Sequence, residues 1–219
     1  MAQRYLAVLA ALALFMLEAA SPVHAQAQKN QAGNAGASPS ASAVAVDYAE
    51  RFKTVCAACH GATGRSDMPG VPVIAGNSSL YVITQLFMFR EGRRKNQAMV
   101  AMAKPMSDAD LKGFSNYIGT LAAVPAPAPA SLPDAARMTK AKALAEQHKC
   151  TYCHGADLAG GQQVPRIGGQ KEEYLSQTLH EYKSGDRPGY TRAMPEALSQ
   201  VAVEDLDILA FYAANISSK

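Results

Sequence analysis

The chain has 219 residues, of which 18% are charged and 48% hydrophobic, as in ordinary globular proteins of one or two domains. A formal net charge of +3 is too small to indicate a nucleic acid partner, and none is expected. The four cysteines would by default form two disulfides in an exported protein, but their spacing indicates a different use.

Residues 1–25 have the pattern of a cleaved export signal. Arg4 precedes an unbroken apolar run from Tyr5 to Leu17, and the segment 23–25 offers the small residues that a signal peptidase requires. Thirteen helical residues cover about 20 Å, less than the roughly 30 Å of a bilayer core, so an uncleaved membrane anchor is the less favoured alternative. We expect a periplasmic protein.

Two segments of biased composition divide the remainder. Residues 26–46 are mostly Ala, Gly, Ser, Gln and Asn, which predicts a flexible leader. Residues 122–133 contain four prolines among alanines, which predicts an extended linker. We therefore expect two domains, domain one over 47–121 and domain two over 134–219.

The two domains are copies of one unit. Three segments of domain one recur in domain two, with small changes of offset that short insertions explain: 56–60 as 150–154, 71–76 as 164–169, and 99–117 as 194–212. A repeat of this length indicates duplication of a whole domain.

Each copy predicts the same helices. A first helix precedes the cysteines, beginning at Asp47 in domain one and at Asp134 in domain two. A second helix covers 79–91 and 172–184, and each ends before a glycine suited to a helix C-terminus. In domain one its apolar stripe is Leu80, Ile83 and Phe87.

The last helix of domain one begins at Ser107, with an acidic residue three positions on, close to a capping box. Its counterpart begins near Ala202. No segment alternates with period two, so the predicted fold class is all-α.

Every cysteine belongs to one of two Cys-x-x-Cys-His motifs, the attachment signature of c-type haem. Two thiols on one helical turn reach the two vinyl groups of the porphyrin, and the adjacent histidine reaches the iron. We therefore expect two covalently bound haem c groups. Their predicted ligands are Cys56, Cys59 and His60 in domain one and Cys150, Cys153 and His154 in domain two.

Paired cysteines also bind zinc or form redox dithiols. A zinc site leaves the histidine after each second cysteine unexplained in both copies. A thioredoxin-like dithiol requires a βαβ context, which the pattern does not contain. Haem is the favoured interpretation.

The sixth iron ligand is expected to be a methionine, because a thioether suits haem iron and raises its reduction potential. Domain two has one methionine after its motif, Met194, eight residues before Ala202. Domain one offers Met99, Met102 and Met106, of which Met99 lies eight residues before Ser107. The repeat therefore favours Met99, and the other two are interpreted as core filler.

Further residues are candidates for support of the haem. The carbonyls of Pro72 and Pro165 lie in equivalent loops and suit the free ring nitrogen of each histidine. Arg94 and Arg187 recur after the second helix and suit haem propionates, although solvated surface positions are an equal alternative. Tyr81 and Tyr174 recur as well and are more often packing residues.

With these motifs in hand, the sequence resembles the dihaem cytochrome c4 family over about residues 47–215, most specifically in 73–92 and 106–111. The resemblance implies two tandem class I cytochrome c domains related by pseudo-twofold symmetry, each iron ligated by histidine and methionine. It also implies electron transfer toward membrane terminal oxidases.

We expect a diffusible periplasmic electron carrier. Its partners would be a membrane quinol–cytochrome c reductase, a terminal oxidase or a periplasmic dehydrogenase, with peripheral contact at the membrane that holds them. The alternative is a cytochrome subunit of a periplasmic dehydrogenase complex. An enzyme with one open haem is disfavoured by Met99 and Met194, and a haem-free interaction module by the two motifs.

Overall fold

The computed structural model describes residues 46–128 and 133–216. The predicted signal peptide and residues 26–45 of the predicted leader lie outside this range, as does part of the linker. Within it, no helix is long and apolar enough to cross a membrane. The described secondary structure is helical, apart from one isolated bridge between Gly161 and Val164.

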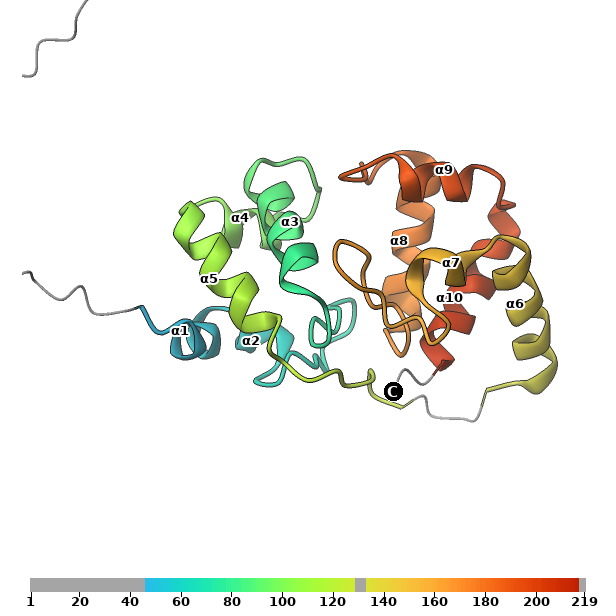
Figure 1. Cartoon of the computed structure of the whole chain (residues 1–219), viewed down its shortest axis with the longest axis horizontal. Coiled ribbons are helices and arrows are strands. Elements are labelled where there is room, and N and C mark those ends of the chain that lie inside the picture. Colours follow the sequence, from blue (N-terminus) through green and yellow to red (C-terminus); the bar gives the residue numbers. More distant parts are fainter. Residues whose placement is uncertain (1–45, 129–132, 217–219) are drawn as a thin grey trace, which may run out of the picture. The chain divides into compact units, whose positions relative to one another are not determined.

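The helices fall into two groups that follow the repeat (Figure 1). Domain one contains α1 (Tyr48–Val55), α2 (Ala57–His60), α3 (Ser79–Arg90), α4 (Gln97–Ala103) and α5 (Asp108–Ile118). Domain two contains α6 (Ala135–Gln147), α7 (Cys150–His154), α8 (Glu172–Ser184), α9 (Ala193–Ser199), the 3₁₀ turn η1 (Val203–Asp205) and α10 (Leu206–Asn215). The all-α prediction with two tandem domains is confirmed.

The first and last helices of domain one, α1 and α5, contact each other. Asp47 caps α1 by accepting from the N–H groups of Ala49 and Glu50, as its sequence position predicts. The ring of Tyr48 lies directly on Gly113 of α5, where a Cβ atom would come within 2.1 Å of the ring. The same ring meets Phe114 edge to face, with centroids 5.1 Å apart. Glycine at position 113 therefore allows the two helices to approach closely.

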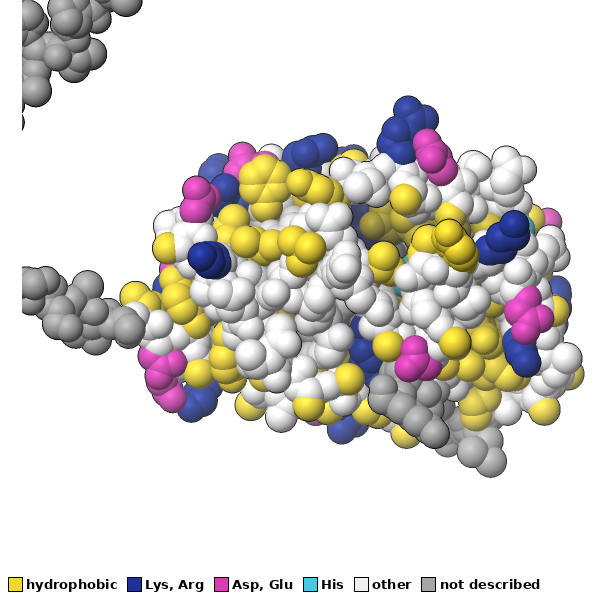
Figure 2. All heavy atoms as spheres, viewed as in Figure 1, with side chains coloured by type: hydrophobic (Ala, Val, Ile, Leu, Met, Phe, Trp, Pro, Cys, Tyr) yellow, Lys and Arg dark blue, Asp and Glu magenta, His cyan; other side chains and the backbone are white. Residues whose placement is uncertain are grey.

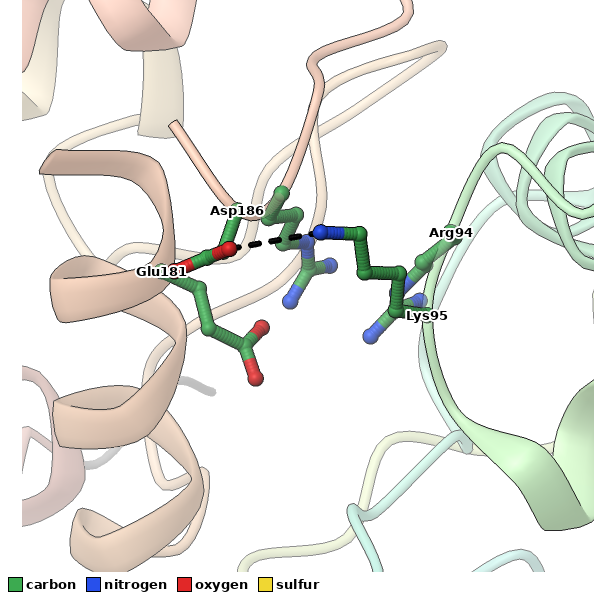
Figure 3. A pocket seen from close by; sticks show the side chains of 5 residues that line it. Arg94, Lys95, Glu181 and Asp186 are labelled. Carbon is green, nitrogen blue, oxygen red and sulfur yellow. Dashed lines mark hydrogen bonds and ion pairs between the residues drawn. The ribbon is translucent and has the colours of Figure 1, made fainter. Parts of the chain in front are cut away.

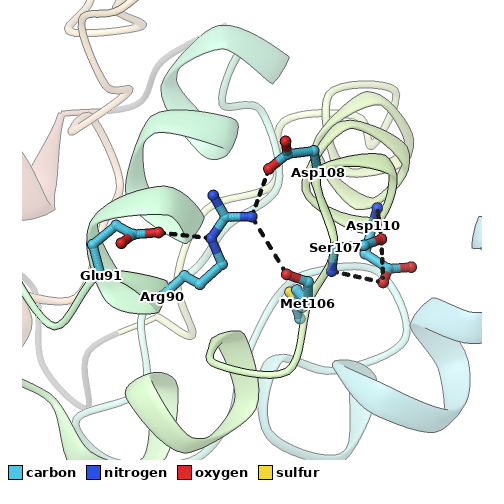
Figure 4. Close-up of polar contacts among 6 residues, drawn as sticks. All are labelled: Arg90, Glu91, Met106, Ser107, Asp108 and Asp110. Atoms are coloured by element: carbon cyan, nitrogen blue, oxygen red, sulfur yellow. Dashed lines mark hydrogen bonds and ion pairs between the residues drawn. The ribbon is translucent and has the colours of Figure 1, made fainter.

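A capping box begins α5 (Figure 4). The Ser107 hydroxyl accepts from the Asp110 N–H, and the Asp110 carboxylate accepts from the Ser107 N–H. Arg90, at the end of α3, donates to the Met106 carbonyl and the Asp108 carboxylate beside this cap. The predicted cap is confirmed, and Arg90 connects it to α3.

In domain two the first and last helices, α6 and α10, pack against each other through small residues. Ala141 and Ala145 of α6 are fully buried in one core cluster with Leu206, Leu209 and Ala210, and α6 contacts α10. The predicted start of the last helix near Ala202 corresponds to η1, which has no side-chain cap. A 3₁₀ turn is a common alternative to a capped helix start.

The structure corrects one prediction about α3. Leu80 is 45% exposed, whereas the buried residues of the helix are Val82, Thr84, Leu86, Met88 and Phe89. Ile83 and Phe87 are only partly buried against the core. Since α3 packs against both α5 and α4, its buried residues do not lie on one apolar stripe, and α4 was not predicted.

Candidate haem-binding sites

Both cysteine motifs form one short helical turn, α2 in domain one and α7 in domain two. The turn ends at Gly61 and at Gly155, whose φ angles are 75° and 83°. At Gly61 a Cβ atom would lie 2.3 Å from the Arg65 carbonyl oxygen, so glycine is required there. All four thiols are free, and those of Cys59 and Cys153 are exposed. Each turn presents two thiols and an imidazole within five residues.

One thiol of each motif, that of Cys56 and that of Cys150, lacks the lowered pKa of a reactive dithiol. Burial raises the pKa of Cys56 to about 11 and also raises that of Cys150, whereas reactive thiols have lowered pKa values. Among the described residues, no group of three or more His, Cys, Asp and Glu side chains is placed to hold a metal ion. The described residues therefore do not provide a complete set of ligands for zinc.

His60 and His154 are buried and held in the same way. The His60 Nδ1 lies 3.1 Å from the Pro72 carbonyl oxygen, and the His154 Nδ1 lies 3.0 Å from that of Pro165. Since a carbonyl only accepts, each Nδ1 carries the proton and Nε2 keeps its lone pair. Burial also lowers the pKa of both imidazoles, so they are neutral at neutral pH. A neutral imidazole with a free Nε2 is what haem iron requires.

The methionines favoured by the repeat lie on two short helices that the sequence did not predict. Met99 is on α4 and packs partly buried against the core of domain one, and Met194 is on α9 and packs in the same way in domain two. Met102 is 42% exposed, whereas Met106 also packs against the core. Asn96 caps α4 by accepting from the Met99 N–H at 3.0 Å.

The recurring arginines meet near the second helices of the two domains (Figure 3). Arg94 donates to the Tyr174 hydroxyl of domain two at 2.8 Å and to Gln85 at 3.0 Å. Arg187 is 4% exposed and donates to Thr178 at 2.8 Å. The alternative of a solvated surface position is therefore wrong for Arg187, while the pairing of either arginine with a propionate stays a prediction.

Two tyrosines share this cluster and have opposite pKa shifts. Burial raises the pKa of Tyr81 to about 12. Burial acts in the same direction on Tyr174, but the charges of Arg94 and Arg187 outweigh it and lower the pKa of Tyr174 to about 7. The hydrogen bond from Arg94 to the Tyr174 hydroxyl accounts for part of this difference, and the same pocket also contains the carboxylates of Glu181 and Asp186.

Sequence reasoning missed a set of buried polar residues in the loops between the cysteine turns and the second helices. Asn77, Arg166, Gln170 and Lys171 are each no more than 7% exposed. One signal was present, because an amide residue follows the glycine of the repeated loop in both copies, at Asn77 and Gln170. Its meaning depends on contacts between the domains.

Charge does not distinguish a docking face on the side of the molecule that Figure 2 shows. On the side shown in Figure 2, basic and acidic side chains are interspersed with hydrophobic ones, and no continuous basic surface covers it.

Comparison with known proteins identifies the class of protein. The cytochrome c family profile matches residues 48–122 and again 138–212, which together are more than half of the chain. The fold and the two Cys-x-x-Cys-His turns define a c-type cytochrome with two domains, each carrying a covalently bound haem c.

Individual relatives identify the family. Cytochrome c4 of Stutzerimonas stutzeri is 30% identical over 176 residues, covering 72% of this chain and 82% of the relative. The crystal structure of reduced recombinant cytochrome c4 from Pseudomonas stutzeri superposes with a TM-score of 0.67 at 25% identity, covering 78% of this chain and 97% of the other. The chain belongs to the dihaem cytochrome c4 family.

A further relative has a more specific name. The "Thiosulfate dehydrogenase electron acceptor" of Thiomonas intermedia is 34% identical over 143 residues, which cover 61% of this chain and 65% of that protein. The chain is therefore similar both to cytochromes c4 and to an acceptor of a particular dehydrogenase.

Proposed function

We propose that the protein is a periplasmic electron carrier whose two haem irons are ligated by His60 with Met99 and by His154 with Met194. The observation that carries the proposal is the equivalence of the two sites. In each, a buried imidazole donates its Nδ1 proton to a proline carbonyl, which leaves Nε2 free, and a methionine packs partly buried on a short helix. When bound, haem iron supplies reversible one-electron transfer between Fe(III) and Fe(II).

The chain supports transfer rather than catalysis. With histidine and methionine on each iron, neither site leaves a position for a substrate. The buried Nδ1–carbonyl hydrogen bond keeps each imidazole in one orientation and one tautomer during a redox cycle. Little reorganisation of the ligands accompanies a change of charge, which favours rapid exchange with a partner.

The carrier would accept electrons from a membrane quinol–cytochrome c reductase or a periplasmic dehydrogenase and pass them toward a terminal oxidase. Two haems allow two electrons to be held at once. Contact with the membrane complexes would be peripheral.

A second candidate is the role of a dedicated acceptor or cytochrome subunit for a periplasmic dehydrogenase. It is favoured by the similarity to the thiosulfate dehydrogenase electron acceptor of Thiomonas intermedia. Purification of the native protein distinguishes the two, because a free carrier is isolated as a monomer and a subunit is isolated with a larger partner. Rapid reduction by a thiosulfate dehydrogenase with thiosulfate, but not by a quinol–cytochrome c reductase, would favour the acceptor.

The ligand assignment is tested by replacing each methionine with leucine. Met99→Leu and Met194→Leu each remove one thioether, so one of the two midpoint potentials falls by on the order of 100 mV, within the 0.8 V range that axial ligands span. Met102→Leu is the matched control in domain one and leaves both midpoint potentials unchanged. A redox titration with optical and magnetic spectra measures both, and a shift for Met102→Leu but not for Met99→Leu would refute the assignment.

A further inference from the structure

The peptide that holds each proximal histidine is also held from the other domain. In domain one the Pro72 carbonyl accepts from His60, and the N–H of the same peptide unit, on Val73, donates to the Gln170 side-chain oxygen at 2.9 Å. Gln170 belongs to domain two. One rigid peptide plane therefore connects an imidazole of domain one to an amide of domain two.

Domain two shows the reciprocal arrangement. The Pro165 carbonyl accepts from His154, and the N–H of that peptide, on Arg166, donates to the side-chain oxygen of Asn77 at 3.1 Å. Asn77 belongs to domain one. Residues 73 and 166 are repeat equivalents, as are 77 and 170, each at the offset of 93 that relates the loops. The two crossed bonds are thus copies of one another.

Both amides are buried and fixed in orientation. Asn77 and Gln170 are each 7% exposed. The Gln170 nitrogen donates to the Val73 carbonyl at 2.7 Å, and the Asn77 nitrogen donates to the Ile74 carbonyl at 3.1 Å. These second bonds leave each amide oxygen as the acceptor for the peptide N–H. Water does not replace them readily at such burial.

Consecutive hydrogen bonds polarise one another. An acceptor on the Val73 N–H makes the Pro72 carbonyl a stronger acceptor, which withdraws the Nδ1 proton of His60 and makes its Nε2 a better donor to iron. A more electron-rich ligand stabilises Fe(III) relative to Fe(II) and lowers the reduction potential. The same reasoning applies to Asn77 and His154.

We propose that Gln170 and Asn77 are positioning residues that set the reduction potential of the haem in the opposite domain, through the Pro72–Val73 and Pro165–Arg166 peptides. This inference rests on the proposed ligation by His60 and His154. It makes each potential dependent on the contact between the domains.

Two uncharged variants test the proposal, and each is expected to change the potential of the haem in the opposite domain. Gln170→Met removes the acceptor from Val73, and the potential of the haem in domain one rises by about 30 mV, a threefold change in the Fe(III)/Fe(II) ratio at 59 mV per tenfold. Asn77→Leu produces a similar rise at the haem of domain two. In each case the haem in the mutated domain keeps its potential.

Ser78→Gly is the matched control. The Ser78 hydroxyl donates to the Gln162 carbonyl of domain two, so this variant also removes a neutral contact between the domains. It does not touch either peptide, and glycine is tolerated at the helix N-cap that Ser78 occupies. Neither potential changes in this variant.

NMR of the reduced, ¹⁵N-histidine-labelled protein provides a second readout and assigns the effects to domains. In Gln170→Met the Nδ1 proton of His60 moves upfield, as its hydrogen bond weakens, and that of His154 does not move. Gln170→Glu keeps an acceptor for Val73 and returns the His60 proton downfield. If Gln170→Met fails to fold, Gln170→Glu still tests the proposal through the position of the His60 Nδ1 proton.

Three results would overturn the proposal: equal shifts of both potentials, a shift confined to the mutated domain, or no shift of potential and proton in folded variants that keep two haems. Failure of the proposed ligation is seen separately, because the wild-type protein would then lack histidine–methionine spectra before any variant is made.

Discussion

The two domains bring the same ligands together with different supports. In domain one the first and last helices meet where the Tyr48 ring packs directly on Gly113. In domain two the corresponding helices meet through Ala141 and Ala145, both fully buried. The proline carbonyls lie 3.1 and 3.0 Å from the two imidazoles nonetheless. After duplication, the groups around the haem stayed alike while the packing that holds them diverged.

The starts of the last helices differ in the same way. Ser107 and Asp110 form a capping box, whereas Ala202 precedes a 3₁₀ turn without a side-chain cap. Domain two compensates elsewhere, since Arg137 stacks on the Phe211 ring of α10 at 3.9 Å and bonds to Glu172 of α8 at 3.0 Å. Domain one also has a cation–π contact between its first and last helices, from Arg51 to the Phe114 ring at 4.9 Å, so the cap is the feature that the two domains do not share.

The largest effect is expected from removing one haem. In the double variant Cys56→Ser and Cys59→Ser the haem content falls from two per chain to one. Domain one then loses most of its helical structure, because a domain this small buries too little surface to fold on side chains alone. The pyridine haemochrome assay and circular dichroism measure both effects.

The matching variant of domain two carries Cys150→Ser and Cys153→Ser and shows whether the two scaffolds depend equally on haem. A haem-depleted domain that stays cooperatively folded and resists protease would contradict the prediction for that domain.

A smaller effect is expected at the cap of domain one. Ser107→Ala removes the acceptor for the Asp110 N–H and lowers the stability of domain one by about 1 kcal/mol. Urea denaturation of the holoprotein, followed at the haem absorbance, measures the loss. An unchanged midpoint would mean that Arg90, not the capping box, fixes this end of the helix.

The reciprocal change tests whether domain two lacks only the cap. Ala202→Ser recreates the spacing of Ser107 and Asp110, because Asp205 already lies three residues on. We expect a gain of about 0.5–1 kcal/mol in the stability of domain two, in the same denaturation experiment. A loss would show that the 3₁₀ start of this helix is required by its packing.

The smallest effect concerns acid stability, where domain one has an ion pair between α1 and α5. The Arg51 guanidinium beside Asp110 holds the pKa of that carboxyl well below its usual value of 3.8. The pair therefore contributes fully above about pH 4, and the contribution disappears as the pH falls through the folded-state pKa. Asp110→Asn weakens the dependence of domain one stability on pH below 4.

Arg51→Met is the matched variant and also weakens the dependence of domain one stability on pH below 4, since either change removes the ion pair. Because Arg51 is 40% exposed on its side chain, the effect is modest. Acid denaturation curves of the three proteins check it, and an Arg51→Met curve parallel to that of the unaltered protein would show that Asp110 acts through its cap alone.

Local patterns predicted much of the fold. Asp47, Asp134 and Ser107 begin or cap helices where expected, because a cap is an interaction between near neighbours in the chain. The helices that carry Met99 and Met194 were missed, since seven residues are too few for a clear apolar period. Leu80 was assigned to the wrong face of its helix because the period gives a face but not which neighbours cover it.

For the candidate sites, the chain alone determined the two haem attachment motifs and the duplication, because covalent attachment depends on spacing within five residues and a repeat can be read by alignment. The same repeat led to the prediction that Met99 and Met194 are the sixth ligands. Only the tertiary structure decided that Gln170 and Asn77 reach the peptides beside Pro72 and Pro165. Hydrogen bonds between residues about 90 positions apart depend on how the domains meet, and no local pattern encodes that meeting.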